Sequence, residues 1–523
     1  MTEILSRPTY IPKDCEVSQH GKILRFVVPT HEWLVLATQL YEEEGFRLLS
    51  VVAEDKREQN LCFEIAFFFA DTHKDLIVVP TLVLQEHEGY PSLSSKYREF
   101  AGYEAEIWTM FGIVPEGHAG LRRTVLHENW PDDIYPLRKD FIGSDRPERL
   151  SSTPYPFFEA TGPGIYQIPV GPVHAGIIEP GHFRFSVSGE QVEYLDAQLG
   201  YVHKGIEKLF EQQSVSEGVA LAERVSGDSS FAHALAYCQA IEQIAHMTVP
   251  PRAEYLRVVY AELERIANHF NDIGFIMLDT AYTFGGANGA RLREQIMQIH
   301  ERLTQSRFLR GVCIVGGVTK DIQSEFAKEL TELLDAIHKD FSEVIQLTEE
   351  SLTLADRLDG TGRLSLDVAT DYGVTGVPLR ALNIVRDARI DHPYAVYDAL
   401  NVTIATSASG DVRARFAVRI AEVHESFRIL ASAISALPQG PISVKSPSVL
   451  PKNSYGIGIV EGWRGDIVTI VGTSDEGGLT RVKVRDTSFL NWQALPHTVV
   501  GEMVPDFPLI NKSWNLSYSG NDL

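Results

Sequence analysis

Cysteine is scarce in this chain, which has only four cysteines in 523 residues. Cys15, Cys62, Cys238 and Cys313 lie far apart, and no two of them form a CxxC pair. An iron-sulfur cluster needs about four grouped thiolates, so the sequence offers no ligand set for one. It offers no disulfide framework either, and we expect reduced, buried thiols.

Basic charge is also in short supply. The chain has 47 Lys and Arg against 70 Asp and Glu, which gives a formal net charge of -23. Phosphate backbones and anionic lipid surfaces are bound by clustered Lys and Arg. The charge therefore argues against a nucleic-acid partner and gives no support for direct binding to a membrane surface.

Long apolar runs are missing as well. The most apolar region, residues 61–84, is interrupted by Glu64, Asp71, Lys74 and Asp75. It therefore falls short of the roughly 18 uncharged residues that a membrane span requires. The first residues lack the basic-then-apolar pattern of a signal peptide. These absences predict a soluble, cytoplasmic chain without a span of its own.

What the sequence does contain changes in character near residue 150. Apolar runs at residues 46–55, 61–70 and 76–84 are separated by polar turns, which predicts an antiparallel meander. Residues 30–45 predict a helix with Thr30 as its N-cap and Gly45 as its stop. We assign residues 1–148 to an α+β domain and residues 149–165, in a stretch rich in Pro, Gly and Ser, to a linker.

Residues 166–523 are predicted to form a mainly α domain with small β elements. Two apolar stripes recur at helical spacing, through Leu256, Tyr260, Leu263, Ala267, Phe270 and Gly274, and through Phe326, Leu330, Leu334, Ile337, Phe341 and Ile345. Hydrophobic residues make up 44% of the chain, which is enough to bury a large core.

One motif raises a question of chemistry. In ERVSGDSSFAHALAY, residues 223–237, Ser226 and Ser229 stand three residues apart, where a thiolate pair would clamp a metal. The serines either cap a helix or line a cavity. Asp228 between them either has a structural role, as a helix cap or in an ion pair with Arg224, or carries a proton together with His233.

Longer stretches resemble known families. EIWTMFGIVPEGHAGLRRTVL followed by YPLRKDF resembles the smaller hydrophilic subunit of respiratory complex I, over about residues 20–145. GPVHAGIIEPGHFRFSVSGE, LGYVHKGIEKLFE and DYGVTGVPLRALNIVRDARIDHPYAVYD resemble the larger subunit, which is related to nickel-iron hydrogenase large subunits. EPGHFRF is closest to the energy-converting, formate-hydrogenlyase type, in which the two subunits are fused. The resemblance implies an α+β domain followed by a hydrogenase-large-subunit-like domain.

The hydrogenase resemblance implies a lost metal site. Hydrogenases carry R-x-C-G-x-C-x-x-x-H, and here Arg224, Gly227 and His233 keep their places while Ser226 and Ser229 replace the cysteines. A second cysteine pair near the C-terminus is replaced by Ser517 and Gly520. A serine hydroxyl is hard and neutral, whereas a nickel-iron centre needs soft anionic sulfur. We expect no metal in this chain.

The complex I resemblance implies a quinone cavity, but with altered contacts. His174 aligns with the first histidine of the quinone loop, Ile178 occupies the place of the second, and Ser226 stands at the expected tyrosine. The candidate cavity lining is His174, His182, Ser226, Ser229, Ser517 and Gly520. The candidates for proton transfer are Glu179, Asp228 and His233, because Glu179 lies near the proton-transfer glutamate of hydrogenases.

Other charged groups are expected to serve structure. Arg122, Arg123, Arg138 and Lys139 would orient a contact between subunits, and Arg386 and Arg389 would form buried ion pairs with Asp387 or Asp391. His203 and Glu207 stand at i,i+4 spacing, which predicts either a surface pair or a proton-transfer pair.

The resemblance implies a peripheral subunit on the cytoplasmic side of a membrane. An iron-sulfur small subunit would supply electrons, the cavity would pass them to a quinone or another small acceptor, and membrane-embedded partners would translocate ions. The chain itself would hold no cofactor. An alternative from a different class is a non-catalytic coupling or scaffold subunit whose cavity transmits conformational change only.

Overall fold

The N-terminal part of the chain is built around one five-stranded sheet. The computed structural model describes residues 8, 10–12, 15–71, 76–151, 154–158, 160–175 and 178–523. The strands are β1 (Val17–His20), β2 (Ile23–Val27), β3 (Arg47–Asp55), β4 (Cys62–Asp71) and β5 (Leu76–Gln85), in the spatial order β1-β2-β5-β4-β3. β3, β4 and β5 pair antiparallel, which confirms the predicted meander, and β2 joins β5 in parallel.

The predicted first helix exists but is shorter and begins differently. A 3-10 turn at Thr30–Glu32 leads into α1 (Trp33–Thr38), and a π-type turn at Gln39–Glu43 follows it. Thr30 is therefore not the N-cap, and Pro29 holds that place without a side-chain bond. Gly45 does end the segment, with a φ of 67° that favours glycine.

Both faces of this sheet are covered, and they are covered by different parts of the chain. On one face, Trp33 of α1 and Phe100 of α3 (Glu99–Phe111) pack against Phe67. On the other face, Phe68 packs in a core with Val468 from a second sheet of β13 (Tyr455–Glu461), β14 (Asp466–Thr473) and β15 (Leu479–Arg485). The N-terminal and C-terminal regions thus share a hydrophobic core.

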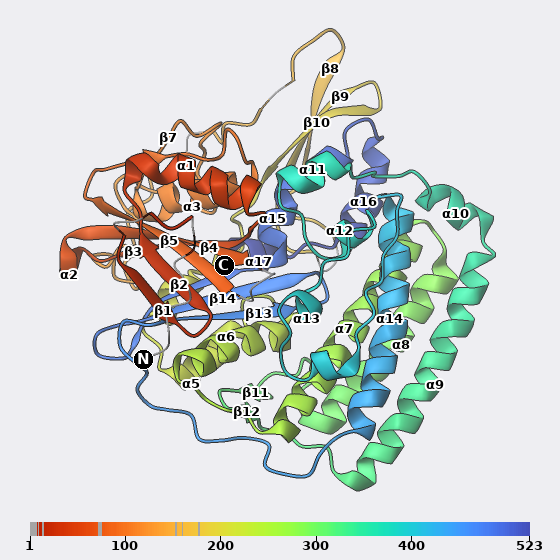
Figure 1. The fold of residues 1–523 in the computed structure, drawn as a ribbon. Helices are drawn as coiled ribbons and strands as arrows, with labels where there is room; N and C mark the ends of the chain where they lie inside the picture. The colour runs from red at the N-terminus through yellow and green to blue at the C-terminus, as the bar shows by residue number, and fades with distance from the viewer. Residues whose placement is uncertain are drawn as a thin grey trace.

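The rest of the chain is mainly helical, as predicted, and both predicted stripes are buried except at Phe326, which is half-buried. The long helices α7 (Pro251–Asp279), α8 (Thr283–Thr304), α9 (Ser324–Glu349) and α14 (Val412–Ser435) form a bundle beside the sheets (Figure 1). The antiparallel strands β8 (Ile165–Val170), β9 (His182–Ser188) and β10 (Gln191–Gln198) project from one end of the molecule (Figure 1). α6 (Ser230–Ile244) is buried against β13 and β14.

Short elements complete the fold. They are α2 (Arg57–Asn60), β6 (Tyr90–Pro91), β7 (Pro115–Glu116), α4 (Ile206–Phe210), α5 (Val215–Ala222), β11 (Cys313–Ile314), β12 (Gly317–Val318), α10 (Leu352–Leu358), α11 (Leu366–Asp371), α12 (Val377–Arg380), α13 (Ala388–Asp391), α15 (Thr487–Ala494), α16 (Phe507–Trp514) and α17 (Tyr518–Asp522). Three 3-10 turns lie at Tyr397–Leu400, Leu495–Thr498 and Val504–Asp506.

Two of the basic residues expected at a contact between subunits instead join the two halves of this one chain. Arg122 binds Asp196 at 2.8 Å, and Lys139 binds Glu211 at 2.9 Å. Each pair connects the region before residue 148 with the region after 165. The contact is internal because the two resembled subunits are fused here.

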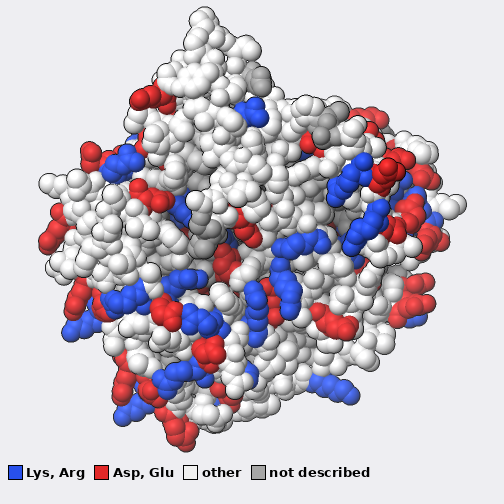
Figure 2. Space-filling view, turned by 180° about the vertical axis from the view of Figure 1, so that it is seen from behind, with Lys and Arg blue, Asp and Glu red and all other residues white. Residues whose placement is uncertain are grey.

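The structure also bears on the expectations drawn from composition. Cys62, Cys238 and Cys313 are buried, as expected, whereas Cys15 is only half-buried. Within the described ranges, no helix has the length and apolar character needed to cross a bilayer. On the face shown in Figure 2, acidic and basic side chains are interspersed.

Candidate functional site

The two serine segments meet in space. Ser226, in the loop before α6, and Ser517, ahead of α17, have their Oγ atoms 2.8 Å apart. The Ser226 hydroxyl donates to Asp228 Oδ1 at 2.8 Å. Because a hydroxyl has a single proton to donate, Ser517 must donate to Ser226. Two former ligand positions, 291 residues apart in sequence, are now joined by a hydrogen bond.

Ser517 and Ser229 differ in how they relate to their helices. Ser517 is a true N-cap of α17, since its Oγ accepts from the Gly520 backbone N–H at 2.8 Å. Ser229 occupies the N-cap position of α6 but makes no capping bond. The carboxylate of Glu264 caps α6 instead, accepting from the N–H groups of Phe231 and Ala232 at 2.7 and 3.0 Å.

Asp228 is held by an arginine that the sequence did not indicate. Arg464 donates to both carboxylate oxygens, with Nη1 2.8 Å from Oδ1 and Nη2 2.6 Å from Oδ2. Burial alone would raise the pKa of Asp228, but the Arg464 guanidinium and the Ser226 hydroxyl hold it below its usual value. The expected partners Arg224 and His233 are not used: Arg224 is exposed and donates to the Ala220 carbonyl.

Asp228 faces a cavity of about 260 Å³. Its side chain keeps 38% of its surface accessible. Glu179 and Lys512 also line the cavity, and Glu179 accepts from the Ser519 backbone N–H at 3.0 Å. The lining thus combines two acidic and two basic side chains, Glu179 and Asp228 with Arg464 and Lys512.

Two of the lining residues, Lys512 and Tyr518, offer hydrogen-bond donors. Lys512 sits over the ring of Phe275, with Nζ 4.6 Å from its centre. Tyr518 is 5% exposed, and its hydroxyl has no hydrogen bond of ordinary geometry among the described residues. Burial raises the pKa of Tyr518 to about 12, so the group remains a donor at neutral pH. Both lie in the C-terminal segment, where the sequence pattern indicated only Ser517 and Gly520.

The predicted site residues divide into three sets. Glu179, Ser226, Asp228 and Ser517 line the cavity. Ser229 and Gly520 lie directly behind it, bonded to Asp228 and Ser517. His174 and His182 are outside the described lining, and His174 Nε2 lies 2.8 Å from the Gly181 carbonyl oxygen within its own loop.

His233 also lies behind the cavity rather than beside Asp228. Its Nε2 is 3.0 Å from Asp486 Oδ2, and both side chains are almost fully buried. Despite its burial, the pKa of Asp486 lies far below the ordinary range, because His233 and the Arg464 charge stabilise the carboxylate. A Cβ at Gly520 would approach Asp486 within 2.7 Å, so glycine is needed there to admit this pair.

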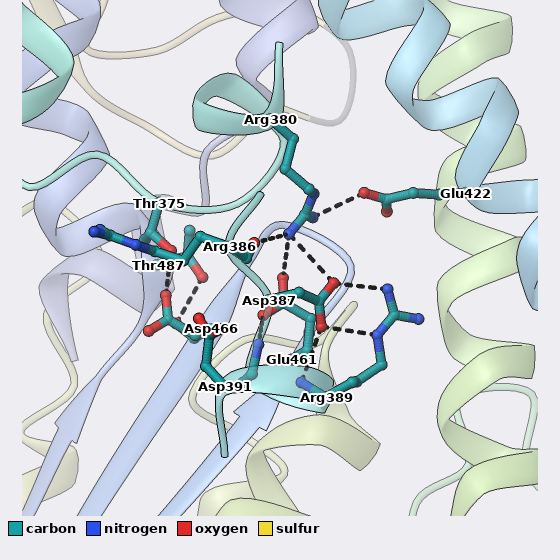
Figure 3. A network of polar contacts seen from close by, with 12 residues as sticks. Thr375, Arg380, Arg386, Asp387, Arg389, Asp391, Glu422, Glu461, Asp466 and Thr487 are labelled. Carbon is teal, nitrogen blue, oxygen red and sulfur yellow. Dashed lines mark hydrogen bonds and ion pairs between the residues drawn. The ribbon is translucent and has the colours of Figure 1, made fainter. Parts of the chain in front are cut away.

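The ion pairs predicted around Arg386 and Arg389 are present in part. Arg389 binds Asp387 through two contacts of 2.9 and 2.7 Å, which confirms the expected pair (Figure 3). Arg386 contributes its carbonyl oxygen to Arg380, and Asp391 pairs with Arg47 of β3 at 3.5 Å. The ion pairs therefore tie this motif to the N-terminal sheet as well.

His203 and Glu207 do not form the predicted surface pair. α4 begins at Ile206, so His203 lies before the helix, and its Nδ1 is 2.7 Å from the Asp522 carbonyl oxygen. Glu207 is buried and binds Arg481 at 2.7 Å. Both line a larger cavity of about 690 Å³ between the two halves of the chain.

The donor set does not fit a nickel-iron centre. Three hydroxyls and a glycine stand at the four positions where the hydrogenase resemblance implies thiolates, and two of these hydroxyls, Ser226 and Ser517, are hydrogen-bonded to one another. Among the described residues, no group of three or more His, Cys, Asp or Glu side chains is placed to bind a metal ion.

Comparison with known proteins adds family information. Residues 26–147 match the family described as the respiratory-chain NADH dehydrogenase 30 Kd subunit, and residues 279–457 match the 49 Kd subunit. Formate hydrogenlyase subunit 5 of Escherichia coli is 31% identical over 489 residues, covering 92% of this chain and 86% of the relative.

Two further comparisons are with proteins of related complexes. A C/D-type NADH-quinone oxidoreductase protein of Phocaeicola vulgatus is 29% identical, covering 84% of this chain and 88% of the relative. A solved chain of an archaeal respiratory membrane complex, the membrane-bound sulfane sulfur reductase, is 26% identical with a TM-score of 0.65. That comparison covers 69% of this chain and 99% of the solved one.

Proposed function

We propose that this chain, which belongs to the family of fused 30 Kd and 49 Kd complex I subunits that includes formate hydrogenlyase subunit 5, passes electrons to a small acceptor. It is a peripheral subunit of a membrane-bound complex of the complex I-like or hydrogenase-related kind. The electrons would come from an iron-sulfur partner protein, and the acceptor would be a quinone headgroup or another small molecule. Membrane partners would couple the reaction to ion translocation on the cytoplasmic side.

The observation that carries this proposal is the rebuilt polar cavity. A collapsed metal site would be expected to fill with apolar side chains, whereas here about 260 Å³ remains open beside Asp228, Glu179, Lys512 and Tyr518. Open space with convergent polar groups is the usual form of a small-molecule site. The cavity supports a bound acceptor in place of a metal.

The cavity residues can serve reduction chemistry in distinct ways. Tyr518 and Lys512 offer protons to an acceptor oxygen, which stabilises negative charge that develops on reduction. Glu179, which contacts the backbone of the C-terminal segment, is the residue best suited to exchange protons with the ligand. Asp228 is held ionised by Arg464 and so fixes the local charge.

Two classes of acceptor are candidates. The relatives include an NADH-quinone oxidoreductase protein and a chain of a sulfane sulfur reductase. Ile178 lines the cavity where complex I would place a histidine, and Ser226 is bonded to Ser517. A quinone would therefore depend on Tyr518 and Lys512 for its contacts.

A second function is favoured by the Ser226–Ser517 hydrogen bond itself. This bond connects the loop before α6 to the C-terminal segment, and it could transmit movement between them without any chemistry. In that case the chain is a coupling or scaffold subunit, and the cavity binds no redox substrate.

Reoxidation of the purified native complex separates the two functions. The complex is reduced with dithionite, and the partner cluster is followed by electron paramagnetic resonance while a tail-free benzoquinone or a polysulfide is added. We expect reoxidation by one of them, with saturation kinetics that Tyr518→Phe weakens. Reoxidation that never saturates, or that is unchanged in the Phe variant, supports the scaffold function instead.

A further inference from the structure

Eight buried ionisable side chains meet outside the cavity, between α7, α12, α13, α14 and β13, and several appear in Figure 3. Each is at most 3% exposed. We call this set the Glu461 network. Its members are Glu262, Asp387, Glu422 and Glu461, Arg265, Arg380 and Arg389, and His269.

The charges of this network do not balance. It contains four carboxylates against three guanidinium groups, and an arginine keeps its charge in proteins. With every carboxylate ionised and His269 neutral, the sum is one negative charge. An uncompensated charge in the interior is costly, so the network has the composition to bind one proton.

Glu461 is the least compensated of the four carboxylates. Asp387 has two contacts with Arg389 as well as Arg380, and Glu422 contacts Arg380, Arg265 and His269. Among the described residues, the Glu461 carboxylate contacts one guanidinium, that of Arg380 at 2.8 Å, together with the Ala388 backbone N–H at 2.9 Å.

The groups facing Glu461 favour its protonated form. Burial, the largest cause, and then the charge of Asp387 raise its pKa to about 7, against the opposing effect of Arg380. Asp466 of β14 also raises this pKa, and Arg265 of α7 lowers it. For His269, burial lowers the pKa in spite of the contact with Glu422. Geometry and charge thus agree on Glu461.

A short turn connects Glu461 to the cavity. Residues 461–466 join β13 to β14, and Arg265 of the network donates to the carbonyl oxygens of Glu461 and Gly462 at 2.7 and 2.9 Å. Two residues further on, Trp463 Nε1 donates to the Asp228 carbonyl oxygen, and Arg464 binds the Asp228 carboxylate. One hairpin turn therefore contacts both sites.

A second connection runs between α7 and α14. His269 pairs with Glu422 at 2.7 Å, and one turn along each helix Asp272 pairs with Arg419 at 2.8 Å. Asp272 accepts from the side chain of Asn515, a cavity-lining residue. The charged stripe thus extends from the network to the cavity wall.

We propose that the Glu461 network is a proton-loading site, in which the Glu461 carboxylate binds one proton from solvent and an electron arriving at the cavity strengthens that binding. The electron comes from the reduced iron-sulfur partner. The proton converts the carboxylate to a carboxylic acid, and no other bond in the network changes. The electron-linked half rests on the proposed function, whereas the proton binding does not.

Infrared difference spectroscopy of the purified native complex tests the proton binding. We expect a carbonyl band of a protonated carboxylic acid that disappears as pH rises through about 7. Glu461→Gln should remove this band. Glu264→Gln, a matched change at a buried carboxyl group outside the network, should remove a separate band that titrates near pH 8 and leave the Glu461 band in place. An unchanged band in Glu461→Gln would overturn the proposal.

A second variant guards against misfolding of the first. Glu422→Gln leaves three carboxylates against three arginines, so the network is neutral without a proton. In that variant the Glu461 band should disappear at a lower pH than in the wild type. A band that titrates at the wild-type pH would contradict the charge count.

Reduction at constant pH tests the link to the cavity. Adding dithionite near neutral pH should increase the Glu461 band in the wild-type complex and not in Glu461→Gln. If the band is insensitive to reduction while an acceptor is reduced normally, the link is wrong and the proposed function stands. If no acceptor is reduced, the proposed function fails, and the pH titration still decides proton binding.

Discussion

Arg464 binds both carboxylate oxygens of Asp228, and the same carboxylate accepts hydrogen bonds from Ser226 and Ser229. Two sequence segments 236 residues apart therefore form one charged unit at the cavity wall. The guanidinium also lies over the ring of Trp463, with Cζ 3.9 Å from the ring centre. In this structure Asp228 is therefore a fixed negative charge at the cavity wall.

The first prediction concerns Asp228→Asn. The amide keeps the size of the side chain but leaves the Arg464 charge uncompensated. Because the carboxylate is 38% exposed, we expect a stability loss of about 1–2 kcal/mol, below that of a fully buried pair. The complex should assemble, and reoxidation by its acceptor should slow by about tenfold with an altered pH dependence, because loss of the fixed negative charge changes the electrostatic environment of the groups that exchange protons in the cavity.

Acceptor-dependent turnover between acid and alkaline pH provides the measurement. Asp475→Asn, a change at an exposed turn, is the matched control and should behave as wild type. Wild-type turnover of Asp228→Asn at every pH would leave Asp228 with a structural role only.

The second prediction removes the other partner. Arg464→Gln leaves Asp228 without its counter-charge, so burial raises the pKa of the carboxylate above its unfolded value. Such a group favours the folded state at low pH and disfavours it as pH rises. We expect a loss of about 2–3 kcal/mol near pH 8 and a smaller loss near pH 5.

The double variant Asp228→Asn, Arg464→Gln provides the control for that pair. Removing both charges should restore part of the loss, which urea denaturation at the two pH values would measure. Additive losses in the double variant would mean that the two residues do not stabilise one another.

The third prediction concerns nickel. The native complex should contain no stoichiometric nickel in this chain, because hydroxyls and a glycine replace all four thiolates. Inductively coupled plasma mass spectrometry of the purified complex is the measurement. Nickel at one equivalent, lost on Ser226→Ala or Ser517→Ala, would refute the assignment.

The fourth prediction concerns the helix cap at Glu264. Burial raises its pKa to about 8, despite the two backbone N–H groups that it accepts from. Its folded-state pKa exceeds the unfolded value, so its stabilising effect is complete in acid and is lost as pH rises through about 8. Glu264→Gln should therefore resemble wild type near pH 5 and exceed it in stability above pH 8, by up to about 4 kcal/mol.

Thermal unfolding across this pH range would follow the difference. The Gln side chain can accept only one of the two capping bonds with its oxygen, which reduces the expected gain. A difference between the two proteins that stays constant with pH would show that Glu264 does not titrate there.

The fifth prediction tests the core shared by the two halves. Phe68 is fully buried between the N-terminal sheet and β13–β14. Phe68→Asp places a charge there and should cost more than about 4 kcal/mol, with the protein lost to the insoluble fraction. Leu61→Asp, at a position 75% exposed, should remain soluble. Soluble, folded Phe68→Asp would indicate that the halves fold separately.

Local periodicity was enough to determine much of this fold. The stripe from Leu256 to Gly274 became α7, and the apolar runs at residues 46–55, 61–70 and 76–84 became β3, β4 and β5. These patterns are visible in the sequence because an element buries one face at its own repeat. The helix cap at Thr30 was wrong, since a 3-10 turn precedes α1 and local capping preference is weak beside tertiary packing.

The sequence by itself also determined the family and the absence of cysteine at residues 226, 229, 517 and 520, where the hydrogenase resemblance implies thiolates. Only the tertiary structure decided what replaced them. The Arg464–Asp228 pair joins residues 236 positions apart, and the Ser226–Ser517 bond joins residues 291 positions apart. Glu461 contacts Arg380, 81 positions away, within a network that several elements build together. A single sequence contains no periodic signal for such contacts, because they depend on how distant elements pack and which charges that packing buries.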